Sequence, residues 1–183
     1  RHRGSEILSY ALAGTAPKDG PNAWTKEQLL TNKKNLVEHN IVRDCIVNTM
    51  RQITPHVTVG ETGIMELSHL YHLRTIITAK DSTKSLVEWA KLLHPTPALG
   101  GEPREKALAL LQEYESHERG MYAAPFGFMK DMGDGIVVVA IRSALIMDNV
   151  LYAYAGCGVV ADSDADEEYA ETNNKMRTIL DAL

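Results

Sequence analysis

The chain of 183 residues contains 44% hydrophobic and 23% charged residues and has a formal net charge of −5. This length and composition exclude collagen-like and disordered proteins. They allow one hydrophobic core to form without disulfides or bound metals. The longest purely apolar run, residues 136–141, is too short to span a membrane, and no Lys/Arg run is typical of nucleic-acid binding. We therefore expect neither a membrane nor a nucleic acid as a partner.

The cysteine count and the start of the sequence bear on its context. Cys45 and Cys157 form no CxxC pair, so the sequence favours neither a zinc ribbon nor a disulfide scaffold and fits a reducing cytoplasm. The sequence starts at Arg1 and carries no basic-then-apolar leader segment. We interpret residues 1–183 as a portion of one domain from a longer protein.

The first third predicts a strand followed by a long helix. Residues 6–15 alternate loosely and predict a strand, and the turn-rich residues 18–22 follow it. Thr25 and Gln28 form a capping box that opens a helix reaching roughly residue 53, before Pro55. The predicted buried stripe of this helix consists of Leu30, Val37, Ile41, Val42 and Cys45.

The rest of the chain predicts further strands and three shorter helices. Strands are expected over 56–62, 64–79, 122–130, 135–146 and 150–160, the last three as a meander with a hairpin turn at Asp148-Asn149. Helices are expected over 86–93, over 104–117 with Pro103 at its first position, and over 164–183 with Ser163 as its cap. Without regular βαβ alternation, this order predicts an α+β fold with a mostly antiparallel sheet packed with helices.

Two charged residues lie where apolar ones are expected. Arg142 falls within a run that is apolar on both faces, and a buried guanidinium must find an anion. That anion is either an internal carboxylate or a ligand, and the residues alone leave both open. Glu38 lies on the apolar stripe of the long helix, where its carboxylate is neutral, paired with a cation or a metal ligand, unless it reaches solvent at the edge of the stripe.

The last helix brings more charges to the same side. Glu168, Glu171 and Lys175 are spaced three and four apart, so they share one helical face beside the apolar positions Tyr169, Met176, Ile179 and Leu180. This face is either solvated or converges with Glu38 on a hard cation. Ligands that are all oxygen indicate Mg²⁺ rather than zinc.

Glycines and a histidine complete the set of candidate residues. Gly156 and Gly158 follow an apolar strand and either form a bulge or bring backbone amides close to an anion. His72 is more often a satisfied core histidine than a catalyst. Together these residues predict a pocket for a small polyanion bound through Mg²⁺.

Eight sequence blocks, in order over nearly the whole chain, resemble the chorismate-utilising enzymes, which include isochorismate, salicylate and anthranilate synthases. The blocks are ALAGT (11–15), KNLVEH (34–39), YHL (71–73), HPTPALGG (94–101), ERGMYAAPFGF (118–128), GDGIVVVAIRSAL (133–145), YAGCGVV (154–160) and EEYAETNNK (167–175). The resemblance implies the C-terminal part of an anthranilate synthase component I-like fold. Ala98, together with the RGMYA, GDG and AIRSA motifs, resembles the isochorismate synthases of the menaquinone pathway.

The resemblance also implies roles for individual residues. Glu38 and Glu171, with Glu168 in the same acidic shell, match carboxylates that hold Mg²⁺. His72 matches a histidine near the substrate ring, which makes it the candidate catalytic residue within this chain. Residues that match the contacts to chorismate or line its pocket are Gly14, Thr15, Ala98, Tyr122, Arg142, Gly156, Gly158 and Lys175.

Several positions depart from the family pattern. Cys157 replaces a small residue, Asn35 stands where many relatives carry an acid, and an Arg often found soon after ALAGT is absent. The family's general-acid Glu and its water-activating Lys fall before Arg1. We therefore expect the isolated chain to be inactive, and to self-associate through the apolar surface that the missing half would cover.

Three functions remain open from the sequence. The chain is part of an isochorismate synthase or a related chorismate enzyme, a module that binds chorismate or Mg²⁺ without turnover, or a structural fragment whose charges form internal salt bridges.

Overall fold

A computed structural model describes residues 1–181 and has a six-stranded sheet at its centre. The strand order is β3–β4–β2–β1–β6–β5, and every neighbouring pair is antiparallel. The strands are β1 (His2–Arg3), β2 (Glu6–Pro17), β3 (Val57–Glu66), β4 (Leu70–Ala79), β5 (Pro125–Met129) and β6 (Gly135–Val139). The predicted α+β fold with an antiparallel sheet is confirmed.

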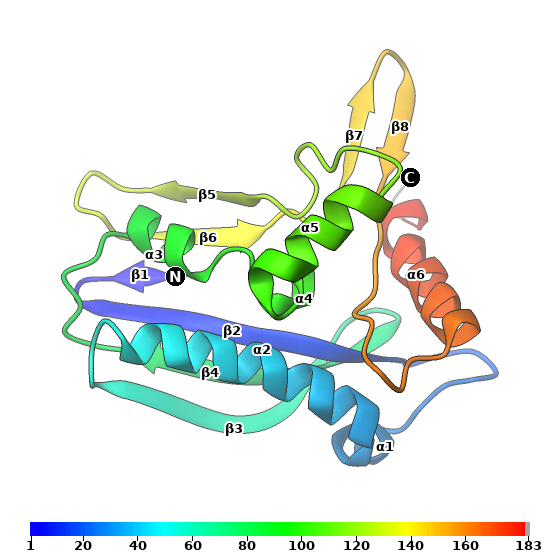
Figure 1. Ribbon diagram of the computed structural model, residues 1–183, viewed down its shortest axis with the longest axis horizontal. Coiled ribbons are helices and arrows are strands. Elements are labelled where there is room, and N and C mark those ends of the chain that lie inside the picture. The colour runs from blue at the N-terminus through cyan, green and yellow to red at the C-terminus, as the bar shows by residue number, and fades with distance from the viewer. Residues whose placement is uncertain (182–183) are drawn as a thin grey trace.

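Six helices and a separate hairpin complete the fold (Figure 1). The helices are α1 (Lys26–Thr31), α2 (Lys33–Arg51), α3 (Leu86–Leu93), α4 (Pro97–Gly100), α5 (Arg104–Tyr114) and α6 (Ala165–Leu180), and the hairpin strands are β7 (Ala144–Met147) and β8 (Val150–Ala153). Helix α2 runs along β2, β4 and β3, the hairpin projects away from the sheet, and α6 lies near the end of β2. Within residues 1–181, none of these helices combines the length and the apolar character that crossing a membrane requires.

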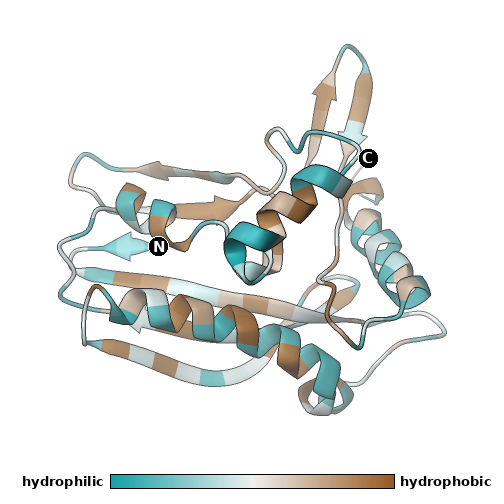
Figure 2. Ribbon diagram, in the orientation of Figure 1, coloured by the Kyte–Doolittle hydropathy of each residue, from teal (hydrophilic) through white to brown (hydrophobic). Residues whose placement is uncertain are grey.

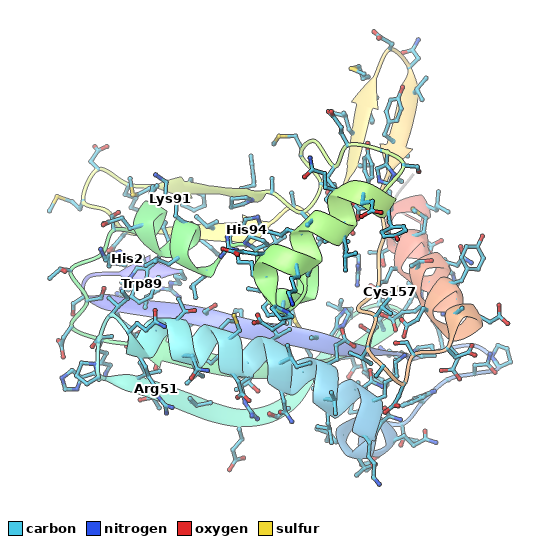
Figure 3. The ribbon with its side chains drawn as sticks, viewed as in Figure 1. His2, Arg51, Trp89, Lys91, His94 and Cys157 are labelled. Carbon is cyan, nitrogen blue, oxygen red and sulfur yellow. The ribbon has the colours of Figure 1, made fainter. Side chains whose placement is uncertain are left out.

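The main core lies between the sheet and helices α2 and α3. Alternate residues of β4 are buried, as expected of a strand with one face on the core. Trp89 is 1% exposed and its indole nitrogen donates to Ser82 Oγ at 3.1 Å, so its one polar atom is satisfied. The buried cluster consists of Ile7, Ala11, Ala13, Val42, Ile46, Val47, Met50, Ile77, Ala79, Leu86 and Trp89. Figure 3 labels Trp89 on α3, and this residue packs in the core cluster against residues of the sheet.

The predicted long helix is interrupted, and its predicted buried stripe is wrong. The capping box of Thr25 and Gln28 is present. Asn32, however, takes an extended conformation and accepts a hydrogen bond from the Asn35 amide, so α1 ends and α2 begins there. Of the five predicted stripe residues only Val42 is buried. The buried residues of α2 are Asn35, His39, Val42, Ile46, Val47 and Met50.

The first strand pair and the shorter helices differ from the prediction only at their ends. Strand β3 continues to Glu66, and the turn to β4 lies at residues 67–69 rather than near residue 63. Helix α3 has the predicted bounds. Helix α5 ends at Tyr114, and Pro103 occupies its N-cap position rather than its first helical position. Asp164, not Ser163, caps α6, because its carboxylate accepts from the Asp166 and Glu167 amides. The predicted end of this helix, residues 182–183, lies outside the described residues.

The predicted three-strand meander is wrong. Strands β5 and β6 join the main sheet. Residues 140–143 interrupt the predicted strand, and among the described residues β7 pairs only with β8. The predicted hairpin turn is confirmed: Asp148 and Asn149 have φ values of 52° and 61°, as a two-residue hairpin loop requires. The interruption matters because Arg142 lies in it.

Apolar side chains are exposed along the edge strand β5. All five residues of β5 are exposed, and Phe126 and Phe128 are 63% and 66% exposed. Strand β5 is also the edge of the sheet, so its outer backbone groups have no strand partner. Figure 2 shows hydrophobic residues along β5, β6 and the β7–β8 hairpin.

Candidate functional site

The site begins at a bulge near the end of β2. The register between β2 and β4 shifts between Leu12 and Thr15, and Gly14 in this bulge has φ +79°, a conformation that favours glycine. Thr15 is paired with His72 of β4, and Thr15 Oγ1 lies 3.0 Å from His72 Nδ1. The Thr15 amide donates to Asn35 Oδ1 of α2 at 3.0 Å. The bulge therefore binds the sheet to the first turn of α2.

Arg142 extends the same cluster from the interruption between β6 and β7. Its Nη2 lies 3.4 Å from His72 Nε2, and its backbone has φ +54°. Among the described residues, Arg142 forms no ion pair and its buried Nε has no hydrogen-bond partner. An internal salt bridge, one of the two alternatives for this residue, is therefore not present in residues 1–181.

The prediction that Arg142 lies within a strand covered on both sides is wrong. Ile136, Val138 and Ile141 are each more than a third exposed, so one side of this segment faces outward. Arg142 follows the strand instead of interrupting its middle. Its guanidinium is still partly withdrawn from solvent, and burial lowers its pKa.

Three carboxylates and two lysines gather where α2 faces α6. Lys34 and Glu168 form an ion pair, and Ser163 Oγ donates to the same Glu168 oxygen at 2.7 Å. Lys175 Nζ lies 2.5 Å from Glu171 Oε1 and donates to the Gly156 carbonyl at 3.0 Å. Glu168 and Lys175 are buried, which places the charged face of α6 inward. The predicted apolar stripe of α6 is therefore only partly correct: Ile179 is buried, but Tyr169 and Leu180 are 70% and 53% exposed.

The segment after β8 closes the cluster with two glycines. A Cβ built on Gly158 would lie 2.6 Å from Glu38 Oε1, and one built on Gly156 would lie 3.1 Å from the Tyr122 hydroxyl. The Tyr122 ring stacks on Tyr154, with ring centres 5.3 Å apart and planes 16° apart. Both glycines thus permit a close approach of polar side chains to the backbone. Figure 3 labels Cys157, the residue between them, on the segment facing α6.

The electrostatics of the site disfavour charge on three residues, Glu38, His72 and Tyr122. Burial, followed by the charge of Glu171, raises the pKa of Glu38. Burial, followed by the charges of Arg142 and Lys175, lowers the pKa of His72 to about 4, so this imidazole is neutral at pH 7. Burial also raises the pKa of Tyr122, which remains a phenol and a hydrogen-bond donor.

Mg²⁺ is the cofactor expected from the sequence, and the donor set fits it in kind. Glu38 and Glu171 offer oxygen ligands, and a cation beside Glu38 would offset the burial and like charge that raise its pKa. Within residues 1–181, no group of three or more His, Cys, Asp or Glu side chains is arranged to hold a metal ion. Because Mg²⁺ commonly takes one or two carboxylates and completes its shell with waters and ligand oxygens, two protein ligands suffice. A metal role for Glu168 stays a prediction.

The structure thus brings together most of the predicted site residues, and it adds two that the sequence reasoning did not place there. Ala98 packs half-buried against the main core cluster, and its contact with a substrate stays a prediction. Lys34 and Asn35 were not predicted as site residues. Their spacing from Glu38, four and three positions on one helix, is the signal that could have indicated them.

The chain matches a known protein family over its full length. The family model described as "Chorismate binding enzyme" matches residues 1–183. The chain belongs to the chorismate-binding enzyme family. The fold and the resemblance inferred from the sequence blocks are thereby confirmed.

Individual relatives are isochorismate synthases of more than one pathway. The salicylate biosynthesis isochorismate synthase of Pseudomonas aeruginosa is 36% identical over 188 residues, which cover 100% of this chain and 40% of that protein. Isochorismate synthase MenF of Bacillus subtilis is 37% identical over 186 residues, 98% of this chain and 39% of that protein. The structure described as a 2,3-dihydroxybenzoate-specific isochorismate synthase, DhbC, from Bacillus anthracis has a TM-score of 0.93 at 33% identity and covers 99% of this chain and 50% of that one. The chain therefore spans half or less of the length of these relatives.

Proposed function

We propose that the chain supplies the part of an isochorismate synthase that binds the carboxylates of chorismate. The observation that carries the proposal is Arg142, which has a buried, unpartnered Nε and no ion pair among the described residues. A buried guanidinium without an anion is costly, and a ligand carboxylate would satisfy it with two hydrogen bonds. The family membership and the isochorismate synthases among the relatives support chorismate as the ligand.

Each part of the site has its own work in this proposal. Arg142 and the Tyr122 hydroxyl hold the enolpyruvyl carboxylate. Glu38 and Glu171 would hold Mg²⁺, which supplies positive charge for the ring carboxylate. Lys175 forms an ion pair with Glu171 and donates to the Gly156 carbonyl, so it fixes the positions of Glu171 and of the Gly156 backbone. These groups bind and orient the substrate, and orientation is one of the larger contributions to catalysis.

The groups that transfer protons are assigned outside residues 1–183 in this proposal. In isochorismate synthesis water adds at one ring carbon and a hydroxyl leaves across the ring, which requires a base and an acid. Losing both costs roughly 10²–10⁴-fold in rate or more, because the two act together. We therefore expect this chain alone to bind chorismate without measurable turnover. Turnover near that of a complete isochorismate synthase would refute this assignment.

The binding experiment is calorimetric titration of the chain with chorismate in the presence of Mg²⁺. Arg142→Gln should weaken binding by roughly 10-fold or more, because a charge-assisted hydrogen bond contributes about 1.5–3 kcal/mol. Arg51→Gln is the matched control, since Arg51 is exposed at the far end of α2. Equal affinities of both variants and the parent chain would refute the role of Arg142. If Mg²⁺ and chorismate both fail to raise the unfolding temperature, the chain is a structural fragment.

The pathway is a finer proposal. We assign the chain to the menaquinone type, on its RGMYA, GDG and AIRSA motifs and the match to MenF. In an enzyme that contains this chain, chromatography after addition of chorismate and Mg²⁺ should show isochorismate as the main product. Dominant salicylate or anthranilate would place the chain with a related chorismate enzyme instead.

A further inference from the structure

A continuous line of hydrogen-bonding groups connects helix α2 to Arg142. Asn32 Oδ1 accepts from the Asn35 side-chain amide at 2.9 Å, and Asn35 Oδ1 accepts from the Thr15 amide at 3.0 Å. Thr15 Oγ1 lies 3.0 Å from His72 Nδ1, and His72 Nε2 lies 3.4 Å from Arg142 Nη2. Each member comes from a different segment except the two asparagines, so the line crosses from helix to sheet to the interruption after β6.

The donors and acceptors along this line fix the state of His72. A guanidinium has only donors, so the His72 Nε2 that faces Arg142 must be an acceptor without a proton. A neutral imidazole with a bare Nε2 carries its proton on Nδ1, which therefore donates to Thr15 Oγ1. Since the hydroxyl oxygen of Thr15 accepts this bond, its own proton is left for another acceptor. No other partner of Thr15 Oγ1 is present among the described residues.

We propose that His72 is a positioning residue, which orients the Arg142 guanidinium through Nε2 and turns the Thr15 hydroxyl proton toward the substrate through Nδ1–H. In this role His72 is not a general base, because Arg142 occupies the lone pair that such a base would use. Thr15, which the resemblance already places in the pocket, then presents its hydroxyl proton to an anionic or hydroxyl oxygen of the ligand. The state of His72 follows from the contacts alone, whereas the substrate contact of Thr15 rests on the proposed function.

Two properties of the surroundings support this inference. Arg142 and Lys175 are the charges that act on His72, and both disfavour a second proton on the ring. The Thr15 backbone is held independently of its side chain by Asn35, which is 6% exposed. A change confined to the Thr15 hydroxyl therefore leaves the bulge in place and tests the side chain alone.

The first test is NMR of the imidazole nitrogens in the ¹⁵N-labelled full chain at pH 7, without ligand. We expect His72 to show a protonated Nδ1 and an unprotonated Nε2. Thr15→Ser and Thr15→Val should both keep this tautomer, because Arg142 still requires an unprotonated Nε2 in each variant. Thr58→Val, on the exposed strand β3, is the matched control and should change nothing. An Nε2–H tautomer or an imidazolium in the parent chain would overturn the inference, as would a Val variant that changes to the Nε2–H form.

The second test measures chorismate affinity in the presence of Mg²⁺. Thr15→Val should weaken binding roughly fivefold to tenfold, the loss of about one hydrogen bond, and Thr15→Ser should restore it. Equal affinity of the Val variant and the parent chain would overturn the substrate contact of Thr15. If the parent chain does not bind chorismate at all, the proposed function fails, while the NMR result still decides the state of His72. If Thr15→Val does not fold, the parent tautomer and the Ser variant decide the question.

Discussion

Gly158 offers a perturbation that separates ligand binding from stability. A Cβ at this position would lie 2.6 Å from Glu38 Oε1 and 3.0 Å from Glu38 Cδ, with no backbone atom among its close neighbours. Ordinary contact begins near 3.4 Å, so Gly158→Ala must move the Glu38 carboxylate by about 0.8 Å. Mg²⁺ holds its oxygens at about 2.0–2.1 Å in a nearly ideal octahedron, so a shift of this size displaces a ligand. We expect Mg²⁺-dependent chorismate binding to weaken at least ~10-fold.

The same substitution should leave the fold almost unchanged. The atoms displaced are the end of a flexible side chain, and Gly158 has no positive φ that alanine would strain. Replacing glycine by alanine where the backbone allows it stabilises a protein by about 0.4–1 kcal/mol, because the unfolded chain loses freedom. The gain and the cost of moving Glu38 are similar in size, so the free energy of unfolding should change by less than about 1 kcal/mol.

Two measurements on one variant test this reasoning. Urea unfolding gives the stability, and calorimetric titration with Mg²⁺ and chorismate gives the affinity. Gly63→Ala is the control, since a Cβ there meets nothing within 4 Å and the site lies elsewhere. If Gly158→Ala bound Mg²⁺ and chorismate like the Gly63 variant, Glu38 would not be a metal ligand. A loss of several kcal/mol in stability would instead show that Gly158 is held by contacts other than Glu38.

Three further outcomes are expected. Gly14→Ala should destabilise the chain by about 1–3 kcal/mol in urea, because φ is +79° and a Cβ would lie 2.9 Å from the Asn35 carbonyl; stability within 0.5 kcal/mol of the parent would refute it. The pKa of His72 is about 4 in the folded chain and near 6.5 in the unfolded chain. The contribution of His72 to the free energy of unfolding is therefore complete above pH 6.5 and is lost as pH falls toward 4. His72→Gln should remove up to about 3 kcal/mol of this pH dependence in unfolding curves at pH 7 and 4.5, and an unchanged dependence would assign it to another group, such as His39. Light scattering should show concentration-dependent oligomers, and Phe128→Lys should abolish them. Oligomers that persist in this variant would show that β5 is not the contact.

The sequence predicted best those features that local chemistry decides. The capping box at Thr25, the hairpin turn at Asp148-Asn149 and the bounds of α3 depend on neighbouring residues, and all three are confirmed. Arg142 and Glu38 were proposed as site residues because charge in an apolar segment requires a partner, although the buried stripe around Glu38 and the covered strand around Arg142 were both predicted wrongly. This reasoning depends on the cost of burial and needs no knowledge of the fold.

What failed depends on contacts between distant segments. The buried face of α2 includes His39, whose ring nitrogens lie 3.1 Å from the Ala13 carbonyl and 2.8 Å from Thr75 Oγ1, and hydropathy cannot anticipate such partners. The meander failed because an apolar run does not show where pairing ends. Strand β6 ends at Val139 and β7 begins at Ala144, and Arg142 is one of the four residues between them. The bond from the Thr15 amide to Asn35 was missed for the same reason, since it joins β2 to α2.

The charges of the site leave two groups of opposite sign unsatisfied. Lys34 neutralises Glu168, and Lys175 neutralises Glu171, so these four residues balance one another. Among the described residues, neither Glu38 nor Arg142 has an ion-pair partner, and the two do not pair with each other. A monoanion would satisfy Arg142 and leave Glu38 beside another carboxylate, whereas a dication alone would satisfy Glu38 and leave Arg142. A dicarboxylate bound together with a divalent cation satisfies both, so Mg²⁺ and chorismate should bind with positive coupling: each should raise the affinity for the other by the same factor.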